Sequence, residues 1–62
     1  MPIIAIEGPP IAAPAVRRQL VEELTAAAAK AYALPPEKII VLIRENSPEQ
    51  VAVGGVLIAD RK

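Results

Sequence analysis

A single long helical segment between two short apolar segments restricts the folds open to this chain of 62 residues. Residues 14–33 place apolar side chains at helical spacing, and Pro14 suits the first turn of a helix. Residues 2–7 suit a short strand, and residues 39–43 are apolar throughout, as in a strand covered on both faces. This order predicts a β-α-β unit with a right-handed crossover. The apolar stripe predicted for the helix comprises Val16, Leu20, Leu24, Ala27, Ala31 and Leu34.

The rest of the chain predicts a small hairpin. Pro35 and Pro36 end the helix, because the residue before a proline avoids helical backbone angles. Residues 44–50 form a polar loop, and Gly54-Gly55 is a turn signal inside the apolar residues 51–59. The predicted fold class is α/β (α+β), a β-α-β unit with a C-terminal β-hairpin. It forms a single domain over residues 1–62.

Such a chain needs further copies of itself. One helix covers one face of a two-stranded sheet, and a chain of this size buries only about 60% of its unfolded surface. Cysteine and histidine are both absent, which excludes disulfides and leaves only carboxylates as metal ligands. Association therefore remains as the source of stability. We expect a homo-oligomer in which the hairpin lies on a neighbouring subunit.

Composition excludes several classes of function. Seven basic and seven acidic side chains balance, so no nucleic-acid or anionic-membrane surface is expected. Tyr32, the one aromatic residue, offers no platform for stacking bases. No apolar run is long enough for a membrane span, and no signal peptide is evident, so a cytoplasmic location is expected. No triad, metal or dinucleotide motif is present, and no cofactor is predicted.

The candidate catalytic group is the nitrogen of Pro2. If Met1 is removed, this nitrogen becomes a free secondary amine that can accept a proton or attack a carbonyl. Burial beside an apolar strand disfavours the charged amine and lowers its pKa towards neutrality. The alternative is structural: a proline suits the first position of a strand, where no ladder donor is needed.

Other charged residues give weaker indications. Glu7 and Glu45 end the two predicted strands and could be neighbours. Arg44 lies about 13 Å along the second strand from Ile40, on the same face. It could reach a site at Pro2 only through a neighbouring chain or a shifted pocket. Three further arginines are expected in solvent or in ion pairs between subunits: Arg17, Arg18 and Arg61.

The order of several short motifs resembles the 4-oxalocrotonate tautomerase family. They are Pro2 at the start, the Glu7-Gly8 strand end, VLIRE at residues 41–45 and VAVGGVLIADR at residues 51–61. The resemblance implies a β-α-β fold with a C-terminal hairpin, two chains forming a four-stranded sheet, and dimers assembling into a hexamer. It also implies that the N-terminal proline amine moves a proton between atoms of an enol or unsaturated oxo acid.

The same resemblance marks further site positions. Where the family has a substrate-binding arginine after the strand-end glycine, this chain has Pro9, and a second such arginine corresponds to Ile40. An aromatic residue before the hairpin corresponds to Val51. Each lost arginine removes a charge-assisted contact worth roughly 1.5–3 kcal/mol, so turnover of a dicarboxylate is expected to be poor. Arg44 is the candidate replacement cation.

Two functions remain open. The first is a cofactor-free tautomerase acting on a small carbonyl or enol substrate, with Pro2 as general base and with Arg44, Ile40 and Val51 contacting substrate. The alternative is a non-catalytic oligomeric module for binding or assembly on the same scaffold. The mass of the intact chain discriminates between them, because a retained Met1 leaves the Pro2 nitrogen as an amide.

Overall fold

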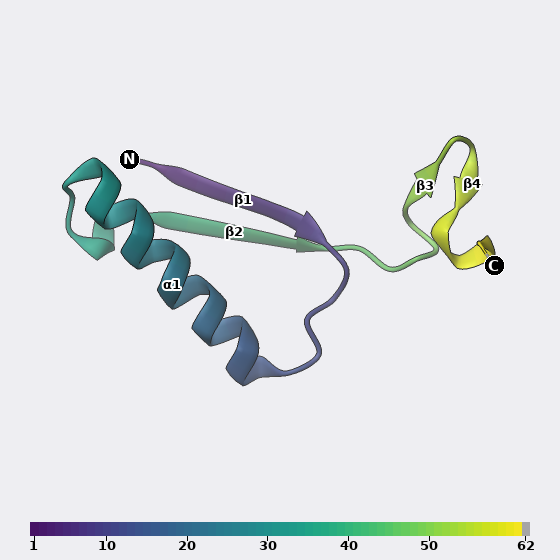
Figure 1. Ribbon diagram of the computed structural model, residues 1–62, viewed down its shortest axis with the longest axis horizontal. Helices are drawn as coiled ribbons and strands as arrows, with labels where there is room; N and C mark the ends of the chain where they lie inside the picture. The colour runs from purple at the N-terminus through teal and green to yellow at the C-terminus, as the bar shows by residue number, and fades with distance from the viewer. Residues whose placement is uncertain (62) are drawn as a thin grey trace.

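The protein forms a β-α-β unit followed by a separate hairpin, seen in a computed structural model that describes residues 1–61 (Figure 1). The elements, in chain order, are β1 (Ile3–Gly8), α1 (Pro14–Tyr32), a 3-10 turn (Pro36–Lys38), β2 (Ile40–Glu45), β3 (Ala52–Val53), β4 (Val56–Leu57) and a second 3-10 turn (Ile58–Asp60). None of the helices within this range is long and apolar enough to cross a membrane.

The two long strands are parallel. The register pairs Ile3 with Ile40 at one end and Gly8 with Glu45 at the other. The predicted fold class, a β-α-β unit with a C-terminal hairpin, is confirmed. The second strand runs further than predicted, because Arg44 and Glu45 continue the ladder and do not begin the loop. Arg44 and Glu45 each pair with an oppositely charged side chain, and these pairs allow polar residues to occupy the end of the strand.

The helix begins and ends without side-chain caps. Pro14 occupies the first turn, where its missing N–H is not needed, and Ala13 supplies no side-chain hydrogen bond. At the other end Ala33 adopts a left-handed conformation (φ 54°), a conformation that costs a non-glycine residue roughly 1–2 kcal/mol. The Leu34 N–H donates to the Ala29 carbonyl (3.0 Å), and the following prolines prevent any continuation.

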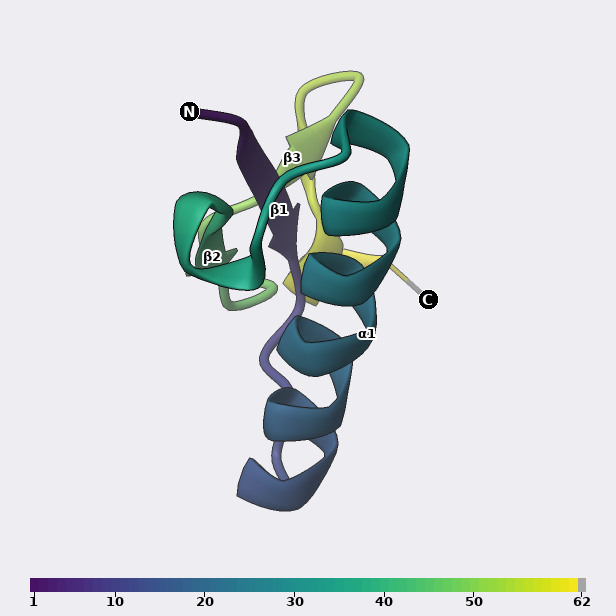
Figure 2. The same ribbon diagram turned by 90° about the vertical axis from the view of Figure 1, so that its left-hand side faces the viewer.

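The helix lies along one face of the two strands (Figures 1 and 2). Its inward side is half-buried at Leu20, Val21, Leu24 and Ala28. Four members of the predicted apolar stripe are exposed to solvent within the single chain. These are Val16, Ala27, Ala31 and Leu34. A sheet of only two strands is narrower than the apolar arc of the helix, so one flank of α1 stays uncovered.

The other face of the sheet is open. Along β1 exposed and half-buried residues alternate, whereas β2 is half-buried at its first two residues and exposed at its last two. The exposed apolar side chains include Ile3 (61% exposed) and Leu42 (46% exposed). No side chain among residues 1–61 is fully buried. The surface area is 4911 Å², whereas a compact monomer of this mass exposes about 3,800 Å². The radius of gyration is 15.0 Å, against about 10.6 Å for a compact domain of this length.

Residues 46–61, which we call the arm, stand away from the β-α-β unit (Figure 1). Strands β3 and β4 pair Ala52 with Leu57, and Gly54 and Gly55 both have positive φ, as a tight type I′ turn requires. The arm exposes several apolar side chains: Val51, Val53, Val56 and Leu57. The hairpin therefore has almost no core within its own chain.

We expect Leu42→Asp to abolish self-association, because it places a charge in the middle of the open face. Sedimentation velocity of the wild-type chain should show an oligomer, and the variant should sediment as a smaller, largely unfolded species. Arg18→Asp, on the exposed side of α1, is the matched control and should associate normally. A wild-type chain that sediments as a folded monomer would contradict this expectation.

Candidate functional site

Pro2 and Ile40 lie together at the amino ends of the two parallel strands. The Ile40 N–H donates to the Pro2 carbonyl oxygen (3.0 Å), which extends the strand ladder by one residue. Pro2 is half-buried and Met1 is exposed. Pro2 thus lies at the amino edge of the sheet, directly before β1 and beside the first residue of β2.

Arg44 and Val51 lie at the opposite end of the sheet. Arg44 is paired in register with Glu7, near the carboxyl ends of the strands. The four-residue separation from Ile40 corresponds to about 13 Å. Val51 belongs to the arm, which continues beyond that end (Figure 1). Within one chain, therefore, the four predicted site residues form two groups and not one site.

Arg44 is held only loosely. Its Nη1 lies 3.8 Å from Glu7 Oε1, and the two side chains are 73% and 62% exposed. An exposed pair of this kind is worth about 0.2–1 kcal/mol, because water and salt screen it. Arg44 is thus available to bind another anion.

The structure separates Glu7 from Glu45. The register places Glu7 opposite Arg44 and Glu45 opposite Gly8, and successive side chains of a strand point to opposite faces. The two carboxylates therefore do not form a catalytic pair. Each is bonded to its own arginine.

Glu45 joins three segments of the chain through hydrogen bonds. Its Oε2 accepts from the Ile11 backbone N–H (2.8 Å) and from Arg17 Nη2 (2.8 Å), and its Oε1 lies 3.0 Å from the same nitrogen. Arg17 Nη2 also donates to the Ile11 carbonyl (2.9 Å). Sequence reasoning missed this cluster and expected Arg17 in solvent or between subunits. One signal was present: Ile11 is the first residue after Pro9-Pro10 that carries a backbone donor.

These contacts stabilise the ionised form of Glu45. The Ile11 N–H, and then the Arg17 guanidinium, hold the pKa of the Glu45 carboxyl below its usual value. The side chains of Arg17 and Glu45 are 41% and 28% exposed, so this pair is better shielded from water than the Arg44–Glu7 pair.

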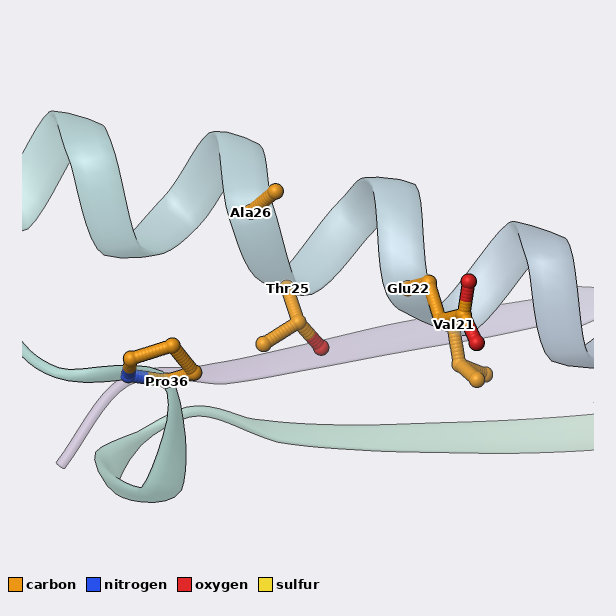
Figure 3. A pocket seen from close by; sticks show the side chains of 5 residues that line it. All are labelled: Val21, Glu22, Thr25, Ala26 and Pro36. Atoms are coloured by element: carbon orange, nitrogen blue, oxygen red, sulfur yellow. The ribbon is translucent and has the colours of Figure 1, made fainter.

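Two of the hollows on the described surface are well formed, and neither is lined by Pro2 or Ile40. The larger, about 310 Å³, lies between α1 and the turn before β2 (Figure 3). Its lining comprises Val21, Glu22, Thr25, Ala26 and Pro36. With one ionisable side chain it has no set of groups for acid-base or nucleophilic chemistry.

The smaller hollow, about 210 Å³, lies between the base of the arm and the turn after β1. Its lining comprises Gly8, Pro9, Asn46, Ser47, Pro48, Val51 and Ile58, none of which is charged. Two positions that the family resemblance marks, Pro9 and Val51, line it. In the part of the chain that the structure describes, no three acidic or other metal-binding side chains gather into a possible metal site.

Comparison with known proteins identifies relatives over nearly the whole chain. A family model described as "Tautomerase enzyme" matches residues 2–61. DmpI from Archaeoglobus fulgidus is 41% identical, with a TM-score of 0.83 over 95% of this chain and 100% of that chain. A 4-oxalocrotonate tautomerase homologue is 31% identical, with a TM-score of 0.88 over 100% of this chain and 98% of that one.

A third related structure is a heterohexamer 4-oxalocrotonate tautomerase from Chloroflexus aurantiacus. It is 27% identical, with a TM-score of 0.84 and coverage of 100% of both chains. Comparison with curated protein sequences gave no match.

The lowered pKa of Glu45 predicts an acid-dependent loss of stability. A carboxyl whose folded pKa is depressed stabilises the fold above its unfolded pKa, and this contribution is lost as pH falls through the folded pKa. The urea midpoint of the wild-type chain should therefore fall more steeply below about pH 4.3 than that of Glu45→Gln, at equal protein concentration. Glu37→Gln, outside the cluster, should follow the wild type. Parallel curves for wild type and Glu45→Gln would refute the assignment.

Proposed function

The chain belongs to the tautomerase family, and we propose that it is a cofactor-free tautomerase that moves a proton within small enol or unsaturated 2-oxo acids. Family membership supports an isomerase-type activity. The observation that carries the finer proposal is the half-buried Pro2 at the amino end of β1, hydrogen-bonded through its carbonyl to Ile40.

The proposed chemistry uses the Pro2 nitrogen as general base. The free amine accepts the hydroxyl proton of an enol while the conjugated electrons shift, and the resulting ammonium returns a proton to carbon. The product is the keto isomer, and the amine is regenerated. Apolar neighbours favour the neutral amine, which moves its pKa towards neutrality and keeps the base available.

This role requires removal of Met1. While Met1 remains attached, the Pro2 nitrogen is an amide and cannot accept a proton. The Met1 side chain is exposed and packs into no core, so its loss removes no packing from the fold. Methionine followed by proline is also a sequence that cellular processing normally cleaves.

We propose further that the working form is a homo-oligomer, built from dimers and hexameric by analogy with the Chloroflexus relative, which is a heterohexamer. The open sheet face, the uncovered helix flank and the arm all support this proposal. Assembly would also bring the separated site residues together, because the carboxyl ends of the strands in one chain can lie beside the amino ends of the strands in another. In that arrangement Ile40 and Val51 form apolar walls around the substrate.

Arg44 is the proposed partner of the substrate carboxylate, supplied by a neighbouring copy. Its pair with Glu7 is long and exposed, so exchanging it for a substrate anion costs little. A guanidinium can bind a carboxylate with two parallel hydrogen bonds, which fixes the substrate as well as attracting it. Ile40 leaves no second cation beside Pro2, which favours a monocarboxylate.

The alternative function is a non-catalytic assembly or binding module. It is favoured by the apolar residue Ile40 beside Pro2, where the family resemblance implies an arginine. It differs from the tautomerase proposal in one respect that can be measured, because it does not need a free Pro2 amine.

Pro2→Ala tests the base directly. We expect ketonisation of the phenylpyruvate enol, a monocarboxylate, to slow by about 10²–10⁴-fold, the usual contribution of a positioned general base. Pro10→Ala, which changes a proline outside the site, should keep the wild-type rate. Equal rates for Pro2→Ala and wild type, with the assembly intact, would contradict the tautomerase proposal.

Arg44→Gln tests the carboxylate contact. We expect KM to rise by at least about tenfold with a smaller change in kcat, because a charge-assisted hydrogen bond worth roughly 1.5–3 kcal/mol is lost. Arg18→Gln removes the same charge from the exposed side of α1 and should leave KM unchanged. An unchanged KM for Arg44→Gln would remove this residue from the site.

A further inference from the structure

The cluster of Glu45, Arg17 and the Ile11 backbone lies where the arm leaves the β-α-β unit. Glu45 is the last residue of β2, and the arm begins at the next residue. The carboxylate holds the end of the strand to the loop after β1 and to the start of α1. The cluster therefore fixes the geometry of the arm's origin.

Hydrogen bonds within the arm connect its two ends. The Ile58 N–H donates to the Val51 carbonyl (2.8 Å), and the Ala59 N–H donates to the Pro48 carbonyl (3.0 Å). The Ser47 N–H donates to Gln50 Oε1 (3.0 Å). These bonds close the base of the hairpin, so the arm moves as one unit and its position depends on how that base is held.

Few contacts hold the arm to the body. Within residues 1–61 the hydrogen bond that links them is from the Asn46 N–H to the Gly8 carbonyl (2.9 Å). Between the turn after β1 and the base of the arm lies the hollow of about 210 Å³. The arm is thus joined to the body at its base, and its direction depends on the residues that fix the ends of β1 and β2.

We propose that Arg17 and Glu45 are positioning residues for self-association: with the Ile11 backbone they hold the arm at the angle at which it docks on a second copy. The occupant of the arm's apolar face is another copy, because residues 51–59 carry no charge and the chain's own sheet face and helix flank are open and apolar. This inference rests on the proposed homo-oligomer and goes beyond it.

The physical effect is preorganisation. An arm free to swing must lose that freedom when it docks, and the lost entropy weakens association. An arm already held at the docking angle avoids that cost. Arg17 and Glu45 thus strengthen assembly without lying in the interface themselves.

The test compares Glu45→Gln and Arg17→Gln with Arg18→Gln in the full chain. Arg18 is the matched control, because it is adjacent to Arg17, exposed, and loses the same charge. Sedimentation equilibrium over a dilution series gives the concentration at which each oligomer dissociates. We expect that concentration to rise by at least about tenfold for the two cluster variants and to stay within about twofold for Arg18→Gln.

Hydrogen exchange separates positioning from a merely structural role. At a concentration where all proteins are assembled, Glu45→Gln should lose protection at the Ile11 amide and keep it at the Ile58 and Ala59 amides. Loss of protection at Ile58 and Ala59 would mean that the arm itself unfolds, which overturns the proposal.

The outcomes also separate this proposal from the one it rests on. A wild-type chain that is monomeric at every concentration overturns the homo-oligomer and this inference together. A wild-type oligomer that the two cluster variants match in dissociation overturns the positioning role alone, and the homo-oligomer stands.

Discussion

The absence of a buried core in the single chain governs the rest of this structure. One helix shields one face of a two-stranded parallel sheet, and no described side chain is fully buried. Burial of apolar surface, at about 25 cal/mol per Å², is the main source of folding free energy. Burying the apolar surface that the single chain leaves open would therefore add a large stabilising free energy. In the proposed homo-oligomer the chain gains it by association, and its small size and lack of cysteine leave few other means.

The same constraint shapes the chemistry. In a parallel sheet all amino ends lie at one edge and all carboxyl ends at the other, so Pro2 and Arg44 cannot meet within one β-α-β unit. A catalytic site that uses both must come from at least two copies. In the proposed homo-oligomer, association supplies stability and active-site geometry through the same contacts, and a substitution that weakens assembly is expected to reduce activity as well.

Much of this fold could be predicted from the sequence, because proline and glycine mark its boundaries. Pro14 begins the helix, Pro35 and Pro36 prevent its continuation, and Gly54-Gly55 makes the hairpin turn. The end of β2 was predicted too early, since Arg44 and Glu45 look like loop residues until their partners are known. The predicted stripe on the helix includes apolar side chains that the single chain leaves exposed. Sequence periodicity shows which side chains are apolar, but it does not show which chain covers them.

The site was less predictable than the fold. The family resemblance marked Pro2 and Ile40 as site positions. The Glu45 cluster depends on contacts between residues that are 34 and 28 positions apart in the sequence, which no local pattern reveals. The direction of the arm depends on that cluster and was likewise beyond prediction. Local sequence preferences determine which helices and strands form, whereas long-range hydrogen bonds determine how those helices and strands are oriented.

The central claim is that each site is shared between copies, and subunit mixing tests it most directly. Pro2→Ala and Arg44→Gln chains are combined in equal amounts, subunit exchange is verified by native mass spectrometry, and the tautomerase rate is compared with that of either variant alone. If the two residues come from different chains, about a quarter of the sites in the mixed oligomers contain both native residues, and activity rises accordingly. Complete exchange with no gain in rate would contradict the shared site.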